Sequence, residues 1–151
     1  MKAVVMIYTI KDLSDPLASY LKDDPVRPHI PHELRFGANR QVLALTEDNT
    51  VHAVVCARLC SIIPKDEQEL LSDNSETPDT AVFYTIWSYH PGAGQKLIRE
   101  GLKELQKAMP TIKRFVTLSP TTDMARRFHL KNGANVFRVN EESVNYEYIQ
   151  L

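Results

Sequence analysis

The sequence predicts a mixed α/β (α+β) fold, in which helices pack against one sheet. Apolar runs of strand character alternate with helical segments in the order β-α-β-β-β-α-β-α-β-β. The middle of the chain, residues 80–133, has the strand–helix–strand–helix pattern of a layered α/β core. A length of 151 residues, with 43% hydrophobic and 25% charged residues, suits a single domain over residues 1–151.

The first sixty residues predict three strands, a short helix and a turn. Residues 2–9 are an apolar run that favours a strand, and residues 13–24 favour a short helix. A proline-rich turn follows at residues 25–37, in which Pro25, Pro28 and Pro31 block regular structure. Residues 41–45 and 51–60 favour two strands, and the EDNT segment between them has the composition of an antiparallel hairpin turn.

The central segment predicts a loop, an interior strand and an amphipathic helix. Residues 64–79 are acidic and loop-like, with a single helical turn at residues 67–71. Residues 80–88 are apolar, aromatic and β-branched on both faces, as expected of a strand inside a sheet. Residues 95–109 carry leucine and isoleucine at helical spacing opposite a basic stripe, which predicts a helix that ends before Pro110.

The last forty residues predict a helix among three strands. Residues 114–120 favour a buried strand, and residues 121–133 favour a second helix. Thr121 or Thr122 is placed to cap this helix, and an Asn-Gly pair is placed to end it. Two strands with alternating aromatic residues follow, at residues 134–140 and 143–151.

The charge balance excludes two classes of partner. Lysine and arginine number 18 and aspartate and glutamate number 19, so the chain lacks the basic excess that binding to nucleic acid or an anionic membrane requires. The apolar run at the start is short for a signal peptide, and no stretch is long enough to span a bilayer. We therefore expect a cytoplasmic protein.

The two cysteines of the sequence, Cys56 and Cys60, fall on one face of the strand predicted at residues 51–60. Two cysteines in such positions ordinarily fill a core, because a metal site would need more ligands nearby. We therefore expect free thiols and no metal.

The segment SYHPGAGQKLI, residues 88–98, contains the first candidate for a functional site. A strand runs into a glycine-rich turn that opens a helix, and the free amides of such a helix start form a site for phosphate or pyrophosphate. Two glycines at a strand–helix turn also have a purely structural interpretation. The residues expected to contact a cofactor here are Trp87, Tyr89, His90, Gly92, Ala93, Gly94 and Gln95.

The turn resembles the pyrophosphate loop of the GNAT superfamily of acyl-CoA enzymes, Q/R-x-x-G-x-G/A, with Tyr89 in place of the leading Gln or Arg. The later segment ARRFHLKNGA resembles the family's A-x-x-F-Y-x-K-x-G-F, with His129 in place of the tyrosine. This resemblance implies a GNAT-like mixed, mostly antiparallel sheet flanked by helices. It also implies that the chain binds a coenzyme A thioester.

Four further motifs, FYTI, TLSP, FHLKNGANVFRVN and VNYEY, occur in the order found in the catalytic domain of malonyl-CoA decarboxylase. This resemblance extends from about Arg35 to Tyr148 and implies that Ser119 and His129 are the catalytic pair. A helical domain precedes the catalytic domain in that family; we expect no counterpart of it in this sequence, so a homo-oligomer is left open. The glycine-rich loop is also shorter here.

The implied chemistry suits both residue types. Loss of CO2 from a malonyl thioester leaves an enolate that must be stabilised and then protonated on carbon. A histidine that titrates near neutral pH is a fitting proton donor, and a serine hydroxyl can orient the carboxylate or the thioester oxygen. His129 could instead be a histidine favoured by the helix dipole, and Ser119 an ordinary hydroxyl at a strand end.

Four arginines have two interpretations each. Arg126, like its neighbour Arg127, lies outside the apolar stripe of its helix and either faces solvent or reaches the phosphates of coenzyme A. Arg35, and with it Arg27, lies where GNAT folds build the acyl pocket and could meet a substrate carboxylate.

The function predicted on this basis is that of an acyl-CoA-utilising carboxy-lyase. It converts malonyl-CoA or a related acyl-CoA to acetyl-CoA or the corresponding acyl-CoA and CO2. No prosthetic group is expected, because the thioester itself accepts the electrons. Two alternatives stay open: an acyltransferase that acts on an amine or thiol, and a non-catalytic CoA-binding module.

Overall fold

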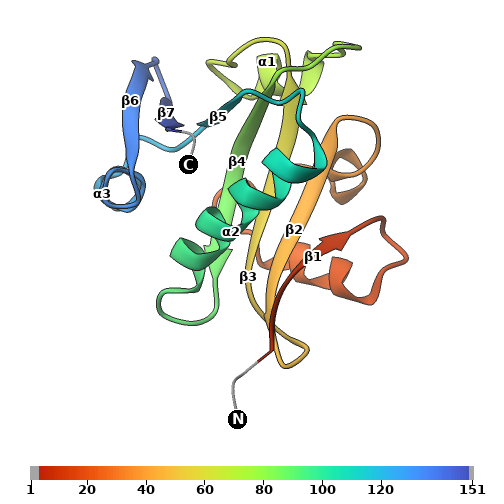
Figure 1. Cartoon of the computed structure of the whole chain (residues 1–151). Coiled ribbons are helices and arrows are strands. Elements are labelled where there is room, and N and C mark those ends of the chain that lie inside the picture. Colours follow the sequence, from red (N-terminus) through yellow and green to blue (C-terminus); the bar gives the residue numbers. More distant parts are fainter. Residues whose placement is uncertain (1–3, 150–151) are drawn as a thin grey trace.

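The computed structural model describes residues 4–149, and a mixed seven-stranded sheet lies at its centre (Figure 1). The strand order is β1-β2-β3-β4-β5-β7-β6, and among the described strands only β4 and β5 pair in parallel. Helices lie against both faces, so the predicted α+β class with a mostly antiparallel sheet is confirmed. The strands are β1 Val5–Ile10, β2 Arg40–Glu47, β3 Thr50–Cys60, β4 Thr80–Ser88, β5 Arg114–Thr117, β6 Ala134–Val139 and β7 Val144–Tyr148.

The helices are three α-helices and two 3-10 helices within the described residues. Their bounds are η1 Pro16–Asp23, η2 His32–Arg35, α1 Glu67–Ser72, α2 Ala93–Ala108 and α3 Asp123–Lys131.

The start of the chain follows the prediction with two differences. Strand β1 begins at Val5, and residues 2–3 of the predicted strand lie outside the described residues. The helix predicted at 13–24 is the 3-10 helix η1, whose Asp15 cap accepts a hydrogen bond from Leu17 N. The proline-rich turn also contains η2, where no regular structure was predicted. Its four residues contain no proline, so a single 3-10 turn fits after Pro31.

The hairpin between β2 and β3 confirms the EDNT turn. Asp48 and Asn49 both adopt positive φ angles, of 50° and 67°, which Asp and Asn tolerate better than most residues. Such backbone geometry matches the twist of an antiparallel hairpin.

Helix α2 begins two residues before the predicted start at 95. Gly92 is its N-cap with φ of 80°, so the glycine-rich turn passes directly into the first helical turn. Helix α3 begins after Thr122, whose side chain accepts a hydrogen bond from Ala125 N, and Gly133 follows it with φ of 99°. Both predicted ends of α3 are therefore confirmed.

Strand β5 is shorter than the predicted strand at 114–120. Its ladder with β4 ends at Thr117, and Ser119 then makes an isolated antiparallel bridge to Val144 of β7. Leu118 N still donates to the Phe83 carbonyl of β4 at 2.9 Å, and Ser119 keeps the contact with β7 that β5 already makes.

The core has two layers, one on each face of the sheet. Helix α2 covers one face, where Leu97, Ile98 and Leu102 pack on side chains of β2, β3 and β4 (Figure 1). The other face packs against η1 and α1, and it includes Leu21, Leu70 and both cysteines, which are buried and free as predicted.

A buried ion pair fastens the segment after η1 to β4. Arg35 Nη1 lies 2.7 Å from Asp24 Oδ2, and neither side chain is exposed. Asp24 Oδ1 accepts hydrogen bonds from the backbone N–H groups of Val26 and Arg27 and from Thr85 Oγ1, at 2.8 to 2.9 Å. This network holds the segment at Pro25 and Val26 against the strand that carries the candidate site.

Candidate active-site cleft

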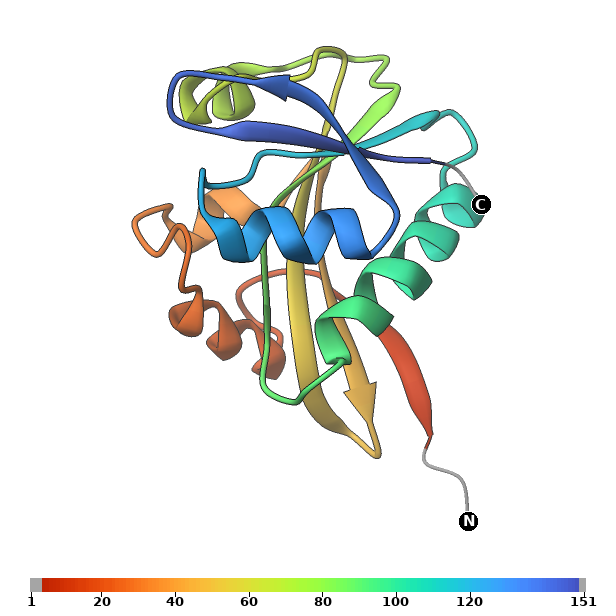
Figure 2. The ribbon, with the colours of Figure 1, turned by 90° about the vertical axis from the view of Figure 1, so that its left-hand side faces the viewer.

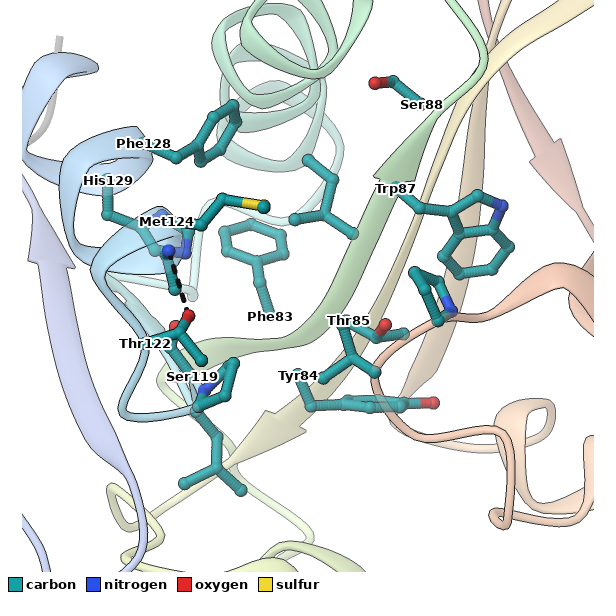
Figure 3. Close-up of a pocket in the computed structure, with 16 residues that line it drawn as sticks. Phe83, Tyr84, Thr85, Trp87, Ser88, Ser119, Thr122, Met124, Phe128 and His129 are labelled. Atoms are coloured by element: carbon teal, nitrogen blue, oxygen red, sulfur yellow. Dashed lines mark hydrogen bonds between the residues drawn. The ribbon is translucent and has the colours of Figure 1, made fainter.

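A cleft opens where β4 and β5 separate. The two strands pair only from Thr80 to Phe83, so the rest of β4, to Ser88, has a partner strand on the β3 side alone. Helix α3 lies across this gap from β4 (Figure 2). The resulting cavity has a volume of about 580 Å³. Its walls come from β4 and α3, with Pro25, Val26 and the Leu118–Pro120 segment completing the lining (Figure 3).

His129 is the buried residue of α3 and faces this cavity. The residue is 5% exposed, and its Nδ1 lies 2.7 Å from the hydroxyl of Tyr148. The ring of Tyr146 stacks on it, with 5.1 Å between centroids and 29° between planes. Both tyrosines come from β7, so this strand determines the position of the imidazole.

The aromatic surroundings change the ionisation of His129. Burial lowers its pKa to about 4, and burial raises the pKa of Tyr148 above its usual value. The imidazole is therefore neutral at neutral pH and the phenol keeps its proton. The expectation that His129 itself titrates near neutrality is wrong, because the sequence does not show how completely β7 covers the ring.

Ser119 lines the same cavity and is also held by β7. Its hydroxyl donates a 2.7 Å hydrogen bond to Thr117 Oγ1, and its backbone exchanges two 2.9 Å hydrogen bonds with Val144. Ser119 and His129 thus face one cavity, but their side chains bond to Thr117 and to Tyr148 and not to each other.

The glycine-rich turn lies beside the cleft. Gly92 has no side chain to cap α2, and no other described side chain supplies a cap hydrogen bond there. A Cβ atom added to Gly94 would lie 3.4 Å from Phe128 Cε1 and 3.9 Å from Ser88 Cβ. Because Phe128 and Ser88 both line the cavity, the first turn of α2 meets the cleft between its two walls.

Among the other residues expected to contact a cofactor, Trp87 lines the cavity. Its Nε1 donates to the hydroxyl of Tyr89 at 3.0 Å, and that hydroxyl donates to Asp23 Oδ2 at 2.8 Å. The hydroxyl of Tyr89, which replaces the Gln or Arg of the GNAT loop, is therefore hydrogen-bonded to Asp23 at the end of η1. His90 stacks on His52, with ring centroids 3.9 Å apart.

The arginines fall into two groups. Arg126 and Arg127 are exposed on α3, as an approach by phosphates would require. Arg35 is fully buried, paired with Asp24, and does not line the cavity, so its placement gives no support to contact with a substrate carboxylate. Arg27 is also buried, where it pairs with Glu67 at 2.9 Å and donates to the Tyr84 carbonyl.

Sequence reasoning assigned no role to Tyr148, Tyr146 or Thr117, although all three position the candidate pair. The alternation of aromatic residues in VNYEY was a usable signal, because it places Tyr146 and Tyr148 on one face of β7. Within residues 4–149, no helix is long and apolar enough to cross a membrane. No cluster of three potential metal ligands occurs in the same range.

Comparison with known proteins shows which families and proteins the sequence is similar to. The family model for the malonyl-CoA decarboxylase C-terminal domain matches residues 44–126, more than half of the chain. Mitochondrial malonyl-CoA decarboxylase of Anser anser anser is 36% identical over 83 residues, which are 52% of this chain and 15% of that enzyme. His129 lies just beyond the stretch that the family model matches.

Solved structures show a similar fold over most of this chain. Malonyl-CoA decarboxylase from Agrobacterium vitis has a TM-score of 0.67 and 26% identity over 82% of this chain and 35% of that one. A PaiA N-acetyltransferase from Thermoplasma acidophilum, solved with coenzyme A, has a TM-score of 0.63 and 13% identity over 96% of this chain and 98% of that one. The predicted GNAT-like fold is therefore confirmed. The chain spans only part of the decarboxylases that it matches.

The buried imidazole should make folding stability depend on pH. The pKa of His129 falls from 6.5 to about 4 on folding, so between these values the unfolded chain binds more protons than the folded one. Stability should therefore be full above about pH 6.5 and decline toward pH 4, by an amount on the order of 3 kcal/mol from this group. Urea unfolding of wild type and of His129→Gln across this range should show a shallower decline in the variant. A matched control is His32→Gln, at a position that is not fully buried; equal declines in all three proteins would contradict the assignment.

Proposed function

Because the chain belongs to the malonyl-CoA decarboxylase C-terminal domain family, we propose that it decarboxylates malonyl-CoA or a close relative. The products are acetyl-CoA, or the corresponding acyl-CoA, and CO2. The observation that carries this proposal is the cleft, in which Ser119 and His129 face one largely apolar cavity at the separation of β4 and β5. An apolar cleft with a few convergent polar groups is the ordinary form of a small-molecule site.

Coenzyme A is proposed to enter the cleft at its α2 side. The uncapped start of α2 offers backbone N–H groups and the positive end of the helix dipole to the pyrophosphate. The exposed side chains of Arg126 and Arg127 supply positive charge for the phosphates from α3. The thioester arm then passes between Ser88 and Phe128 toward His129. The complex of the related N-acetyltransferase with coenzyme A supports a ligand of this class.

The thioester supplies the electron sink for the reaction. As the carbon–carbon bond to the carboxylate breaks, its electron pair moves into the thioester carbonyl, and CO2 and an enolate result. No prosthetic group is needed for this step. The apolar lining strengthens hydrogen bonds to the developing enolate oxygen, because little water competes for it.

His129 supplies the proton in this proposal, although it is neutral in the free protein. The negative malonyl group, once in the same cavity, raises the pKa of the imidazole and lets it take one proton from solvent. After CO2 leaves, the imidazolium passes that proton to the enolate carbon and becomes neutral again. Tyr148 holds Nδ1 throughout, which leaves Nε2 for the exchange with substrate.

Ser119 orients the substrate in this mechanism. Its hydroxyl can rotate from Thr117 and donate to the carboxylate or the thioester oxygen. Attack by this hydroxyl on the thioester is not proposed, because a serine nucleophile needs an adjacent base and Ser119 is bonded to Thr117 instead of His129.

Variants of the candidate pair test the proposed function. His129→Gln should bind coenzyme A normally and lose turnover by roughly 10²- to 10⁴-fold, the usual contribution of a general acid. Ser119→Ala should also lose turnover with affinity preserved, because both residues act on the reacting group. The measurement is the rate of acetyl-CoA formation from malonyl-CoA without an acceptor, beside titration of coenzyme A. Normal rates in folded His129→Gln would show that the histidine has a structural role only and does not supply the proton.

The same assay separates the proposal from its two competitors. A transferase would release free coenzyme A only after an amine or thiol is added. A binding module would bind malonyl-CoA and leave it intact in every condition.

Two glycines of α2 allow a matched test of the CoA site. A side chain at Gly94 would project toward Phe128 and Ser88, so Gly94→Val should narrow the cleft and weaken coenzyme A binding by about tenfold or more. Gly101 lies on the same helix, where an added Cβ meets Leu43 at an ordinary 3.8 Å, so Gly101→Ala should bind normally. Calorimetric titration of both folded variants is the measurement. Equal affinities would show that coenzyme A does not use this end of the cleft.

A further inference from the structure

A second pocket lies at the start of β2 and near the end of β3, and it shares no lining residue with the cleft. Its volume is about 450 Å³. Arg40 and Arg58, which both line it, are directly opposite each other in the β2–β3 ladder. Residues opposite each other in an antiparallel pair extend to the same face of the sheet, so two guanidinium groups share one pocket.

Hydrogen bonds hold the loop between α1 and β4 beside this arginine pair. Arg58 Nη2 donates to the carbonyl of Asp73 at 2.6 Å, and Asn39 Nδ2 donates to the carbonyl of Ser75 at 2.8 Å. The Asp73 carboxylate is occupied by backbone N–H groups of Ser61 and Ser75, each at 3.0 Å. Its charge therefore lies near the pair without forming an ion pair with either arginine.

The guanidinium groups keep hydrogen-bond donors unused. Arg58 is 3% exposed, yet its Nε and Nη1, together with Nε of Arg40, are buried without a partner in the described chain. No carboxylate within residues 4–149 lies at ion-pair distance from either side chain. Burial and the neighbouring charge of Arg40 lower the pKa of Arg58, as expected for an uncompensated cation. Unpaired buried donors and like charges on facing strands both destabilise a fold.

We propose that this pocket binds the oxyanion group of a small molecule, a phosphate or a carboxylate, between Arg40 and Arg58. Guanidinium groups match both anions with paired, charge-assisted hydrogen bonds, and the bound anion would offset the repulsion between the two arginines. Asn39, Asn74 and Ser75 give the rest of the lining a polar character that suits an organic ligand. The nearby carboxylates of Asp73 and Glu76 favour a ligand with one anionic group over a polyphosphate.

The test is titration calorimetry with inorganic phosphate and, separately, with acetate, at an ionic strength held constant with sodium chloride. Wild type should bind at least one of the two anions saturably, and the preferred anion identifies the group that the natural ligand carries. Arg40→Gln should bind that anion about tenfold more weakly, the usual loss for a charged hydrogen bond. Arg99→Gln removes the same charge from the exposed side of α2 and should bind as wild type does.

A second measurement on the wild-type protein does not depend on the folding of any variant. The side-chain Nε–H resonances of Arg40 and Arg58 should shift during the anion titration. Two outcomes would overturn the proposal: no saturable binding of either anion, or binding that Arg40→Gln retains at full strength in the folded state. Retained binding would place the anion elsewhere, for example at the start of α2. Neither outcome depends on whether the cleft decarboxylates malonyl-CoA.

Discussion

The separation of β4 from β5 is the constraint on which the candidate site depends. Parallel pairing ends at Phe83 and Thr117, and β4 continues to Ser88 without a neighbour on that side. An unpaired strand edge presents free N–H and C=O groups, and cover by a helix or loop is one of the ways in which proteins protect it. Helix α3 supplies this cover, and the space left between helix and strand is the cleft. At the α2 end of this space an added Cβ at Gly94 would contact Phe128 at 3.4 Å, so a larger side chain there would narrow the cleft.

Strand β7 gives the cleft its polar groups in fixed positions. Val144 bridges to Ser119, the backbone N–H of Tyr146 donates to Thr117 Oγ1, and the hydroxyl of Tyr148 contacts His129 Nδ1. An imidazole buried among tyrosine rings is neutral, since the charged form would lose its hydration without gaining an anionic partner. An anionic substrate changes that balance. In the proposed mechanism the same burial that makes the free histidine a poor acid makes its protonation depend on the substrate.

Much of this arrangement could be predicted from local sequence. The continuous apolar run of β4, the apolar stripe of α2, the Thr122 cap and the glycine turns each follow from side chains within a few residues. The parts that could not be predicted depend on contacts between distant segments. The low pKa of His129 results from tyrosines on β7, and the burial of Arg35 results from its pairing with Asp24. Strand β5 ends at Thr117 and Ser119 bridges to the distant Val144, an arrangement that the apolar run at 114–120 does not reveal.

The central claim is that the cleft releases CO2 from a malonyl thioester and returns one solvent proton to carbon. Mass spectrometry of malonyl-CoA incubated with the wild-type protein in D2O, without any acceptor, tests both parts at once. The account predicts acetyl-CoA that carries one deuterium in its methyl group. Malonyl-CoA that remains intact although it is bound would contradict the account, as would free coenzyme A and malonate as the products.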